Sequence, residues 1–256
     1  MKTIFKSTVI YVMCMLVSII TFGQEKKQYF DEIKGVKMSP PRFIGNENLS
    51  AVLNQTQFRS INDYLAKQIQ YPEKSKDWQE EGTEVIQFVV TPKSEVTDLR
   101  IINSVSSEID REVIRVLKTT NGLWMPGLNN GQPVAMGKEI SINFKFCNSA
   151  DEINSATNFV DLAKQYFNKG NRQLFVKENI KSALRQYNKA ICYLPNDKSI
   201  LAIRGICKYE LGDKNGACTD WNRVKALGGL TTDYYLDKFC ELKGYSELVS
   251  SLQEKK

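Results

Sequence analysis

The second half of the chain repeats at an interval of 34 residues. The repeated pairs are Ala183 with Ala217, Tyr187 with Trp221, Ala190 with Val224, and Pro195 with Gly229. Small residues at such positions let two helices approach closely, and an aromatic ring fills the space between them. A unit of this length buries its apolar face only by stacking on a neighbouring unit. The period therefore predicts an all-α array of paired helices.

Local features refine the predicted array. Gly205 lies where the two helices of a unit need close contact, and Gly212 lies where the chain turns. Residues 168–179 interrupt the pattern of the first unit, and we expect an enlarged loop there. We expect residues 233–253 to cap the array. Two units with a cap form a short solenoid, so support from the first half of the chain is expected.

The first half carries the pattern of a small antiparallel sheet with helices. Residues 82–91 are rich in β-branched residues and apolar on both faces, which predicts a central strand. A short turn leads to a second strand over residues 96–105, so the two form a hairpin. The apolar periodicity of residues 60–72 and 106–120 predicts two amphipathic helices.

The last strand of this half alternates between apolar and polar residues. Its apolar positions are Ile140, Ile142, Phe144 and Phe146, and its polar positions are Glu139, Ser141, Asn143 and Lys145. This alternation gives one dry face and one wet face, which is typical of a sheet edge at the end of a folded unit. Charges on the wet face of an edge discourage unwanted pairing. The preceding stretch WMPGLNNGQPV, residues 124–134, is interpreted as a stiff crossover into this strand.

The composition excludes the common enzyme mechanisms. The chain has no histidine, which removes Ser-His and Cys-His nucleophile pairs, His-ligated zinc and imidazole proton shuttles. The acids Asp77, Glu80, Glu81 and Glu84 are interpreted as a solvated run. The net charge of +6 is scattered, with no basic run that contains interleaved aromatic residues. We therefore expect no enzymatic activity, no cofactor, no metal site and no nucleic-acid partner.

The N-terminus predicts export. Lys2 and Lys6 precede an apolar run over residues 8–22, the pattern of a secretory leader. Residues 1–23 are therefore predicted to be a signal peptide, followed by a linker over residues 24–40. In the alternative, residues 8–22 stay uncleaved and anchor the protein in the inner membrane.

Six cysteines occur in the chain, of which Cys14 lies in the leader. The others are Cys147, Cys192, Cys207, Cys218 and Cys240. Their spacings match no metal site. We expect buried helical thiols, with one disulfide in an oxidising compartment as the alternative.

Residues 41–146 resemble the C-terminal domain of TonB, in the version common in energy transducers of the Bacteroidetes. The matching pieces are PRFIG at 41–45, YLAK at 64–67, IQYP at 69–72, VIQFVV at 85–90, VTDLRIINSV at 96–105, Asp110 with REVIRVL at 111–117, WMPGLNNGQPV at 124–134 and ISINFKF at 140–146. The second half resembles a tetratricopeptide array, most clearly in GACTDWNRVKALG at 216–228.

The first resemblance implies an α+β domain over residues 41–147, in which a small antiparallel sheet packs on helices. A linker over residues 148–157 and an all-α tetratricopeptide array with its capping helix over residues 158–250 then follow. Domains of the TonB family bind a short segment of an outer-membrane receptor by strand addition to the last strand. The residues that carry over as the partner-binding edge are Glu139, Ile140, Ser141, Ile142, Asn143, Phe144 and Lys145.

The resemblance predicts a periplasmic interaction protein that binds an outer-membrane transporter or another envelope protein in TonB-dependent transport. In the alternative, the array is a scaffold and the first domain is structural. The candidate groove of that scaffold consists of Ser199, Ala202, Ile206 and Tyr209. A true energy transducer with an uncleaved anchor is a third hypothesis, but the proline-rich spacer of such proteins is missing here. The edge strand is also a candidate for pairing in a homodimer.

Overall fold

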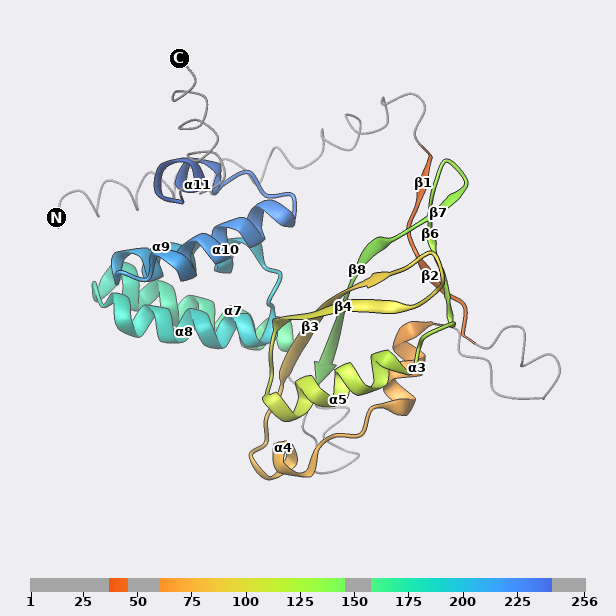
Figure 1. Cartoon of the computed structure of the whole chain (residues 1–256). Helices are drawn as coiled ribbons and strands as arrows, with labels where there is room; N and C mark the ends of the chain where they lie inside the picture. The colour runs from red at the N-terminus through yellow and green to blue at the C-terminus, as the bar shows by residue number, and fades with distance from the viewer. Residues whose placement is uncertain (1–36, 46–59, 146–157, 241–256) are drawn as a thin grey trace, which may run out of the picture.

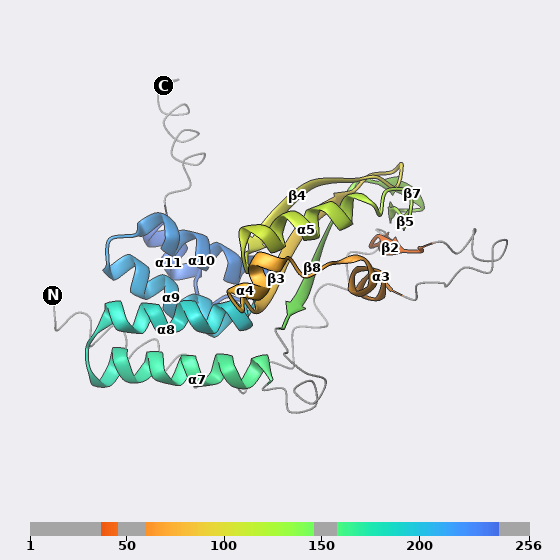
Figure 2. The ribbon, with the colours of Figure 1, turned by 90° about the horizontal axis from the view of Figure 1, so that it is seen from below.

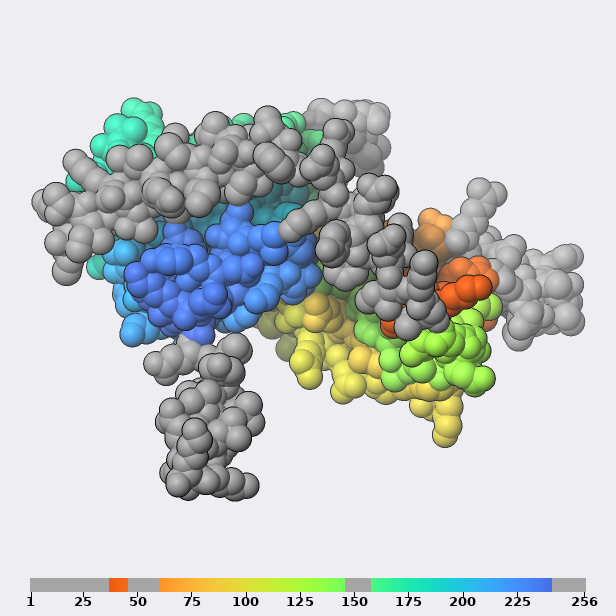
Figure 3. All heavy atoms as spheres, turned by 90° about the horizontal axis from the view of Figure 1, so that it is seen from above, coloured from red at the N-terminus to blue at the C-terminus, as the bar shows by residue number. Residues whose placement is uncertain are grey.

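The computed structural model describes residues 37–45, 60–145 and 158–240. The predicted leader, residues 24–36 of the first linker, all of the second linker, Phe146, Cys147 and residues 241–250 lie outside the described residues. Figure 1 shows two parts, a sheet part with helices α3 to α5 and a helical array from α7 to α11. The space-filling view in Figure 3 shows that the two parts are in direct contact.

The sheet part is organised around strand β3 (Gly82–Val90). It lies between β4 (Val96–Asn103) and β8 (Met136–Phe144) in a three-stranded antiparallel sheet. This confirms the predicted central strand and the predicted hairpin. Ile86 and Phe88 are buried on the face of β3 that carries the hydrophobic core of this part.

Two helices cover that core face (Figure 2). Helix α5 (Ser107–Lys118) buries its apolar stripe completely, and the Ser106 hydroxyl caps it by accepting from the Ile109 amide at 3.4 Å. Helix α3 (Ile61–Gln68) ends earlier than predicted, with Ile69 already in an extended conformation. The short helix α4 (Glu73–Asp77) begins directly after Pro72.

The stretch WMPGLNNGQPV is more than a crossover. It forms β5 (Trp124–Met125), β6 (Gly127–Asn129) and β7 (Gln132–Val134). Strands β6 and β7 make a tight hairpin whose turn residues Asn130 and Gly131 have φ of 50° and 81°. Two positive φ angles in a two-residue loop match the twist of a hairpin, which explains the Asn-Gly pair.

Two N-terminal strands pair with this hairpin. Strand β1 (Met38–Ser39), predicted as linker, pairs with β6, and β2 (Arg42–Phe43) pairs with β5. Trp124 is 1% exposed and packs edge-on against the rings of Phe43 and Phe88. The stretch therefore joins the N-terminal strands to the core.

The array consists of antiparallel helices (Figures 1 and 2). Its helices are α7 (Phe159–Asn171), α8 (Ile180–Tyr193), α9 (Lys198–Glu210), α10 (Lys214–Ala226) and α11 (Asp233–Phe239). The predicted loop over residues 168–179 is wrong, because α7 continues into a π-helix, η1 (Arg172–Val176). Its wider turn contains Leu174, which is buried in the array core.

The repeat is visible as a recurring glycine–aromatic contact. A Cβ atom at Gly170 would lie 2.5 Å from the Tyr187 ring, and one at Gly205 would lie 2.3 Å from Trp221 Nε1. Only glycine allows these helices to approach so closely, which confirms the expected role of Gly205. Gly212 has a φ of 90° and makes the expected turn after α9. The tetratricopeptide assignment itself stays a prediction.

A disulfide joins Cys218 on α10 to Cys240 at the end of α11. The alternative of one disulfide is therefore confirmed. Cys207 is a buried free thiol and Cys192 an exposed one, while Cys147 lies outside the described residues.

Candidate partner-binding edge

Strand β8 forms one edge of the three-stranded sheet. It pairs with β3 in an uninterrupted register of Cα partners from Gly82↔Phe144 to Val90↔Met136. Within the described residues, no strand pairs with its other side. In antiparallel geometry, alternate residues of an edge strand direct their N–H and C=O groups away from the sheet. These groups provide a template for another strand.

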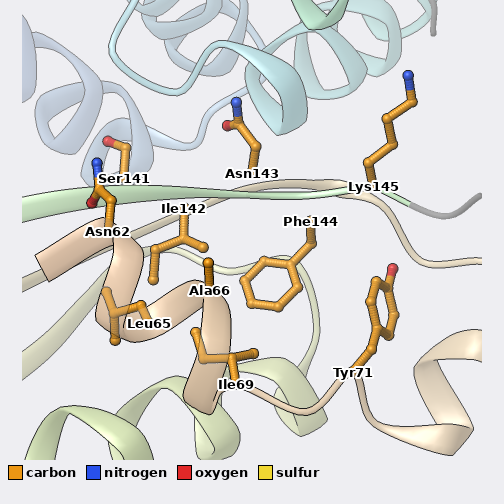
Figure 4. A pocket seen from close by; sticks show the side chains of 10 residues that line it. All are labelled: Asn62, Leu65, Ala66, Ile69, Tyr71, Ser141, Ile142, Asn143, Phe144 and Lys145. Atoms are coloured by element: carbon orange, nitrogen blue, oxygen red, sulfur yellow. The ribbon is translucent and has the colours of Figure 1, made fainter. Parts of the chain in front are cut away.

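A groove of about 420 Å³ lies between this edge and helix α3. Its lining residues are Asn62, Leu65, Ala66, Ile69, Tyr71, Ser141, Ile142, Asn143, Phe144 and Lys145. Figure 4 shows Ile142 and Phe144 on the α3 side of β8, and Asn143 and Lys145 pointing toward the helical array. The Tyr71 ring packs edge-on against Phe144, with centroids 5.8 Å apart, and its hydroxyl donates to the Glu80 carbonyl.

The predicted edge residues therefore separate into three environments. Ser141 to Lys145 line the groove, while Ile140 is 7% exposed and belongs to the core. Glu139 pairs with the array and is only partly exposed, so its charge is not the free charge that was expected at the edge. The sequence reasoning missed the α3 wall, although the small Ala66 beside apolar Leu65 and Ile69 was a signal for a close approach on that helix face.

Glu139 is held by a polar network between the two parts. Arg223 Nη2 donates to Glu139 Oε1 at 2.6 Å, and Asn196 Nδ2 donates to the same oxygen at 3.0 Å. Gln87 Nε2 donates to Glu139 Oε2 at 2.8 Å. Burial opposes ionisation, but the hydrogen bonds from Arg223 and Gln87 outweigh it and lower the pKa of Glu139. Glu139 is therefore an ionised link between β8 and the array.

The opposite edge of the sheet, β4, has a different surface. Its register with β3 shifts twice, between Val85 and Ile86 and between Gln87 and Val89. Asp98 in β4 has a φ of 50°, which is unusual for a residue other than glycine. Asp98 and Arg100 are exposed. Bulges and exposed charges are devices that protect an edge from further pairing.

The residues predicted to line a groove in the array occupy other environments. Ala202 is 7% exposed, and its carbonyl accepts a hydrogen bond from the Trp221 indole at 3.3 Å. Ile206 and Tyr209 pack against the aromatic cluster of α10 and α11, and the Tyr209 ring lies 4.5 Å from Phe239. Of the four, Ser199 alone is exposed. Helices α10 and α11 thus cover part of the face that the sequence predicted as open, and Ser199 stays exposed.

The prediction that the four acids are solvated is wrong for Glu84, which is completely buried. Burial, reinforced by the nearby charge of Asp110, raises the pKa of Glu84 to about 8. Glu84 Oε2 accepts from the Val105 amide at 2.9 Å, and Oε1 has no hydrogen-bond partner. Glu84 does not line the edge groove, so we assign it a structural role.

Two further properties concern metals and membranes. Among the residues the structure describes, no cluster of acidic, cysteine or histidine side chains is suited to hold a metal ion. Over the same ranges, the helices are too short or too polar to cross a bilayer.

One family model matches residues of the sheet part. Residues 67–146 match the family described as Gram-negative bacterial TonB protein C-terminal. The solution structure of the Helicobacter pylori TonB C-terminal domain aligns with 16% identity and a TM-score of 0.28, over 35% of this chain and 92% of that one. No curated protein matches the chain. The family match includes α5, β3, β4 and β8, and therefore includes the edge.

Proposed function

We propose that this protein is a TonB-like envelope protein that binds an extended segment of an outer-membrane transporter in the periplasm. The bound segment adds as a further strand to β8, and the protein performs no catalysis. One observation carries the proposal. Among the described strands, β8 is a regular edge with no partner on its outer side, and it borders a groove with both polar and apolar lining, whereas β4 is bulged and charged.

The physical basis is main-chain pairing. Outward N–H and C=O groups of β8 supply affinity without special side chains, and the groove adds pockets for alternate side chains of the segment. Ala66, Ile69 and Ile142 are at least partly exposed in the groove and offer apolar surface there. The match of residues 67–146 to the TonB C-terminal family supports the choice of an outer-membrane transporter as the partner.

The test is capture from an envelope extract, followed by identification of the bound proteins by mass spectrometry. The bait is the purified protein, compared with Ser141→Pro and Ile142→Pro. Adjacent residues of β8 point their amides in opposite directions, so one of the two prolines removes an outward donor. We expect the variant that lacks the outward amide to capture outer-membrane transporters more than ten-fold less than wild type does. The reason is that several main-chain hydrogen bonds fail together.

The matched control is Arg100→Pro on the opposite edge. It places a proline in β4 and is expected to leave the capture of transporters unchanged. Circular dichroism and thermal unfolding verify that each variant folds. Equal capture of transporters by wild type and both β8 variants would contradict strand addition.

A further inference from the structure

Two carboxyl groups meet where β3 packs against the start of α5. Glu84 of β3 is completely buried, whereas Asp110 is partly exposed and lies in the first turn of α5. The charge of Asp110 acts on Glu84, and the Asp110 side chain is within hydrogen-bonding reach of it. Two ionised carboxylates repel each other and have no proton to donate. The pair is therefore satisfied only when one proton lies between the two groups.

The surroundings of the two groups place that proton. Glu84 Oε2 accepts from the Val105 amide at 2.9 Å, and Glu84 Oε1 has no donor among the described residues. Asp110 accepts from the Ser104 hydroxyl, whose oxygen lies 2.8 and 3.0 Å from its two carboxylate oxygens. An ionised carboxylate is costly in the interior, whereas a partly exposed one keeps contact with water. The proton therefore belongs on Glu84 Oε1, from which it is donated to Asp110.

No cation compensates a charge at this position. Among the described residues, Asp110 on α5 is the one charged group that acts on Glu84. The segment between β4 and α5 contributes the Val105 amide, and β8 contributes apolar Ile142, the Cα partner of Glu84. Burial raises the pKa of Glu84 to about 8, and the charge of Asp110 adds to the increase, while the hydrogen bond from Val105 opposes it.

The acid pair adjoins the end of β8 that lines the groove, residues 141–145. Thr83, the residue before Glu84, ties the same end of the sheet together. Its hydroxyl donates to Asn143 Oδ1 at 2.9 Å, and its carbonyl accepts from Asn103 Nδ2 at 2.7 Å. An unpaired charge in the interior favours a local opening that lets water reach it. Ionisation of Glu84 therefore acts on the part of β3 that supports the groove.

We propose that Glu84 and Asp110 share one proton and form a pH-sensitive lock on the groove end of the β8 edge. With the proton in place, the start of β3 is held against the start of α5, and residues 141–145 are held in register. Loss of the proton opens this end of the sheet locally. The lock is a property of the fold and goes beyond the proposed function, so its failure would leave strand addition untouched.

The direction of the effect follows from the closed and opened states. In the opened state Glu84 meets water and has its ordinary pKa of 4.5, whereas the closed state keeps the proton up to about pH 8. Opening therefore releases a proton in this range. The opening constant rises roughly ten-fold for each pH unit within it and then levels off. The edge is held most firmly on the acidic side of this range.

The experiment is hydrogen exchange of the whole protein from pH 5 to pH 8, under conditions in which reclosing outpaces exchange. Rates are corrected for the intrinsic exchange of each amide. In wild type, residues 82–86, 104–109 and 140–144 should lose protection roughly ten-fold per pH unit, while amides of the array change less.

Two variants separate the parts of the lock, and circular dichroism verifies that each folds. Glu84→Gln should hold its protection constant across the pH range. Its amide imitates the protonated acid, because the oxygen accepts from Val105 and the N–H donates to Asp110. Asp110→Asn supplies an N–H donor to an ionised Glu84, so its loss of protection should level off at a lower pH than in wild type.

The matched control is Glu95→Gln, which replaces an exposed carboxyl in the turn between β3 and β4 and should follow wild type. Protection of the three segments that stays constant with pH in wild type overturns the lock. An Asp110→Asn curve that coincides with the wild-type curve overturns the shared proton. Equal loss of protection in the sheet and in the array means that the protein opens as a whole, which also overturns a local lock.

Discussion

Strands β8 and β4 flank the same central strand, yet they present opposite kinds of edge. β8 keeps one register along all of its length and borders the groove against α3, whereas β4 shifts register twice and exposes Asp98 and Arg100. Both edges leave main-chain groups unpaired, so hydrogen-bonding capacity alone does not distinguish them. In our proposal, the regular geometry of β8 and the groove beside it favour docking of a further strand, whereas the distortion and charge of β4 oppose it.

The largest expected effect concerns Glu84, on the strand between the two edges. Its folded-state pKa of about 8 lies above the ordinary value of 4.5, so the folded protein keeps a proton that the unfolded chain releases. The folded state therefore binds more protons between about pH 4.5 and pH 8, and stability falls as pH rises through that window.

Glu84→Gln removes this titration. Between pH 4 and pH 9, the free energy of unfolding of the variant should rise by on the order of 4 kcal/mol relative to that of wild type. This estimate uses about 1.4 kcal/mol per unit of pKa difference. Urea unfolding at both pH values measures the difference. If the free energy of unfolding depends on pH in the same way in both proteins, Glu84 ionises normally. Hydrogen exchange at β4 and β8 then tells whether the buried carboxyl affects both edges equally.

The second prediction compares the stability of the array with that of the sheet that carries both edges. Cys218→Ala/Cys240→Ala opens a covalent loop of 22 residues between α10 and α11. The expected cost is about 3 kcal/mol, because the unfolded chain regains its loop entropy. Hydrogen exchange of α10 amides during urea unfolding reports on the array, and exchange of β3 amides reports on the sheet. Equal loss of protection in both parts would mean that they unfold as one unit.

A third prediction concerns the anchor of β8. A double-mutant cycle of Glu139→Gln and Arg223→Ala should give a coupling energy of about 1.5 kcal/mol, because this ion pair is partly buried and carries a charge-assisted hydrogen bond. The control cycle is Lys76→Ala with Glu73→Gln, an exposed pair expected to give at most about 0.5 kcal/mol. Urea unfolding of the single and double variants provides both values. Similar couplings in the two cycles would remove the distinction between the pairs.

The smallest effect tests the distortion of β4. Asp98→Gly places a residue without a Cβ atom at a φ of 50°. Relief of backbone strain should raise stability by about 0.5–1 kcal/mol, partly offset by the entropy of glycine. Thermal unfolding measures the change. Gly137→Ala on β8, where a new Cβ meets nothing within 4 Å, is the matched change at the regular edge. A loss of stability in Asp98→Gly would show that the bend is not strained.

The fold was predictable from sequence where one periodicity dominated. The alternation of Ile140, Ile142 and Phe144 predicted the dry face of β8, and the repeat predicted the packed aromatics Tyr187 and Trp221. The prediction was less complete where the pattern was short. The hairpin in residues 124–134 was missed because its strands are two or three residues long and gain stability only from pairing with β1 and β2.

The site was predictable only in part. Ser141 to Lys145 line the groove as a strand-addition site requires, but Glu139 was placed at a solvent face that the array covers. The array groove was predicted open, although Ile206 and Tyr209 pack against the aromatic cluster of α10 and α11. In both cases a sequence pattern shows which face of an element a residue occupies, but not which distant segment covers that face.

The sequence by itself determined the local elements, the central position of β3, the dry face of β8 and the spacing of the helical repeat, because these follow from periods of two, 3.6 and 34 residues. Only the tertiary structure decided that Glu84 is buried, that Cys218 pairs with Cys240, and that Arg223 reaches Glu139. Those outcomes depend on contacts between residues far apart in the chain. The energies of such contacts depend on burial and distance, which no local pattern encodes.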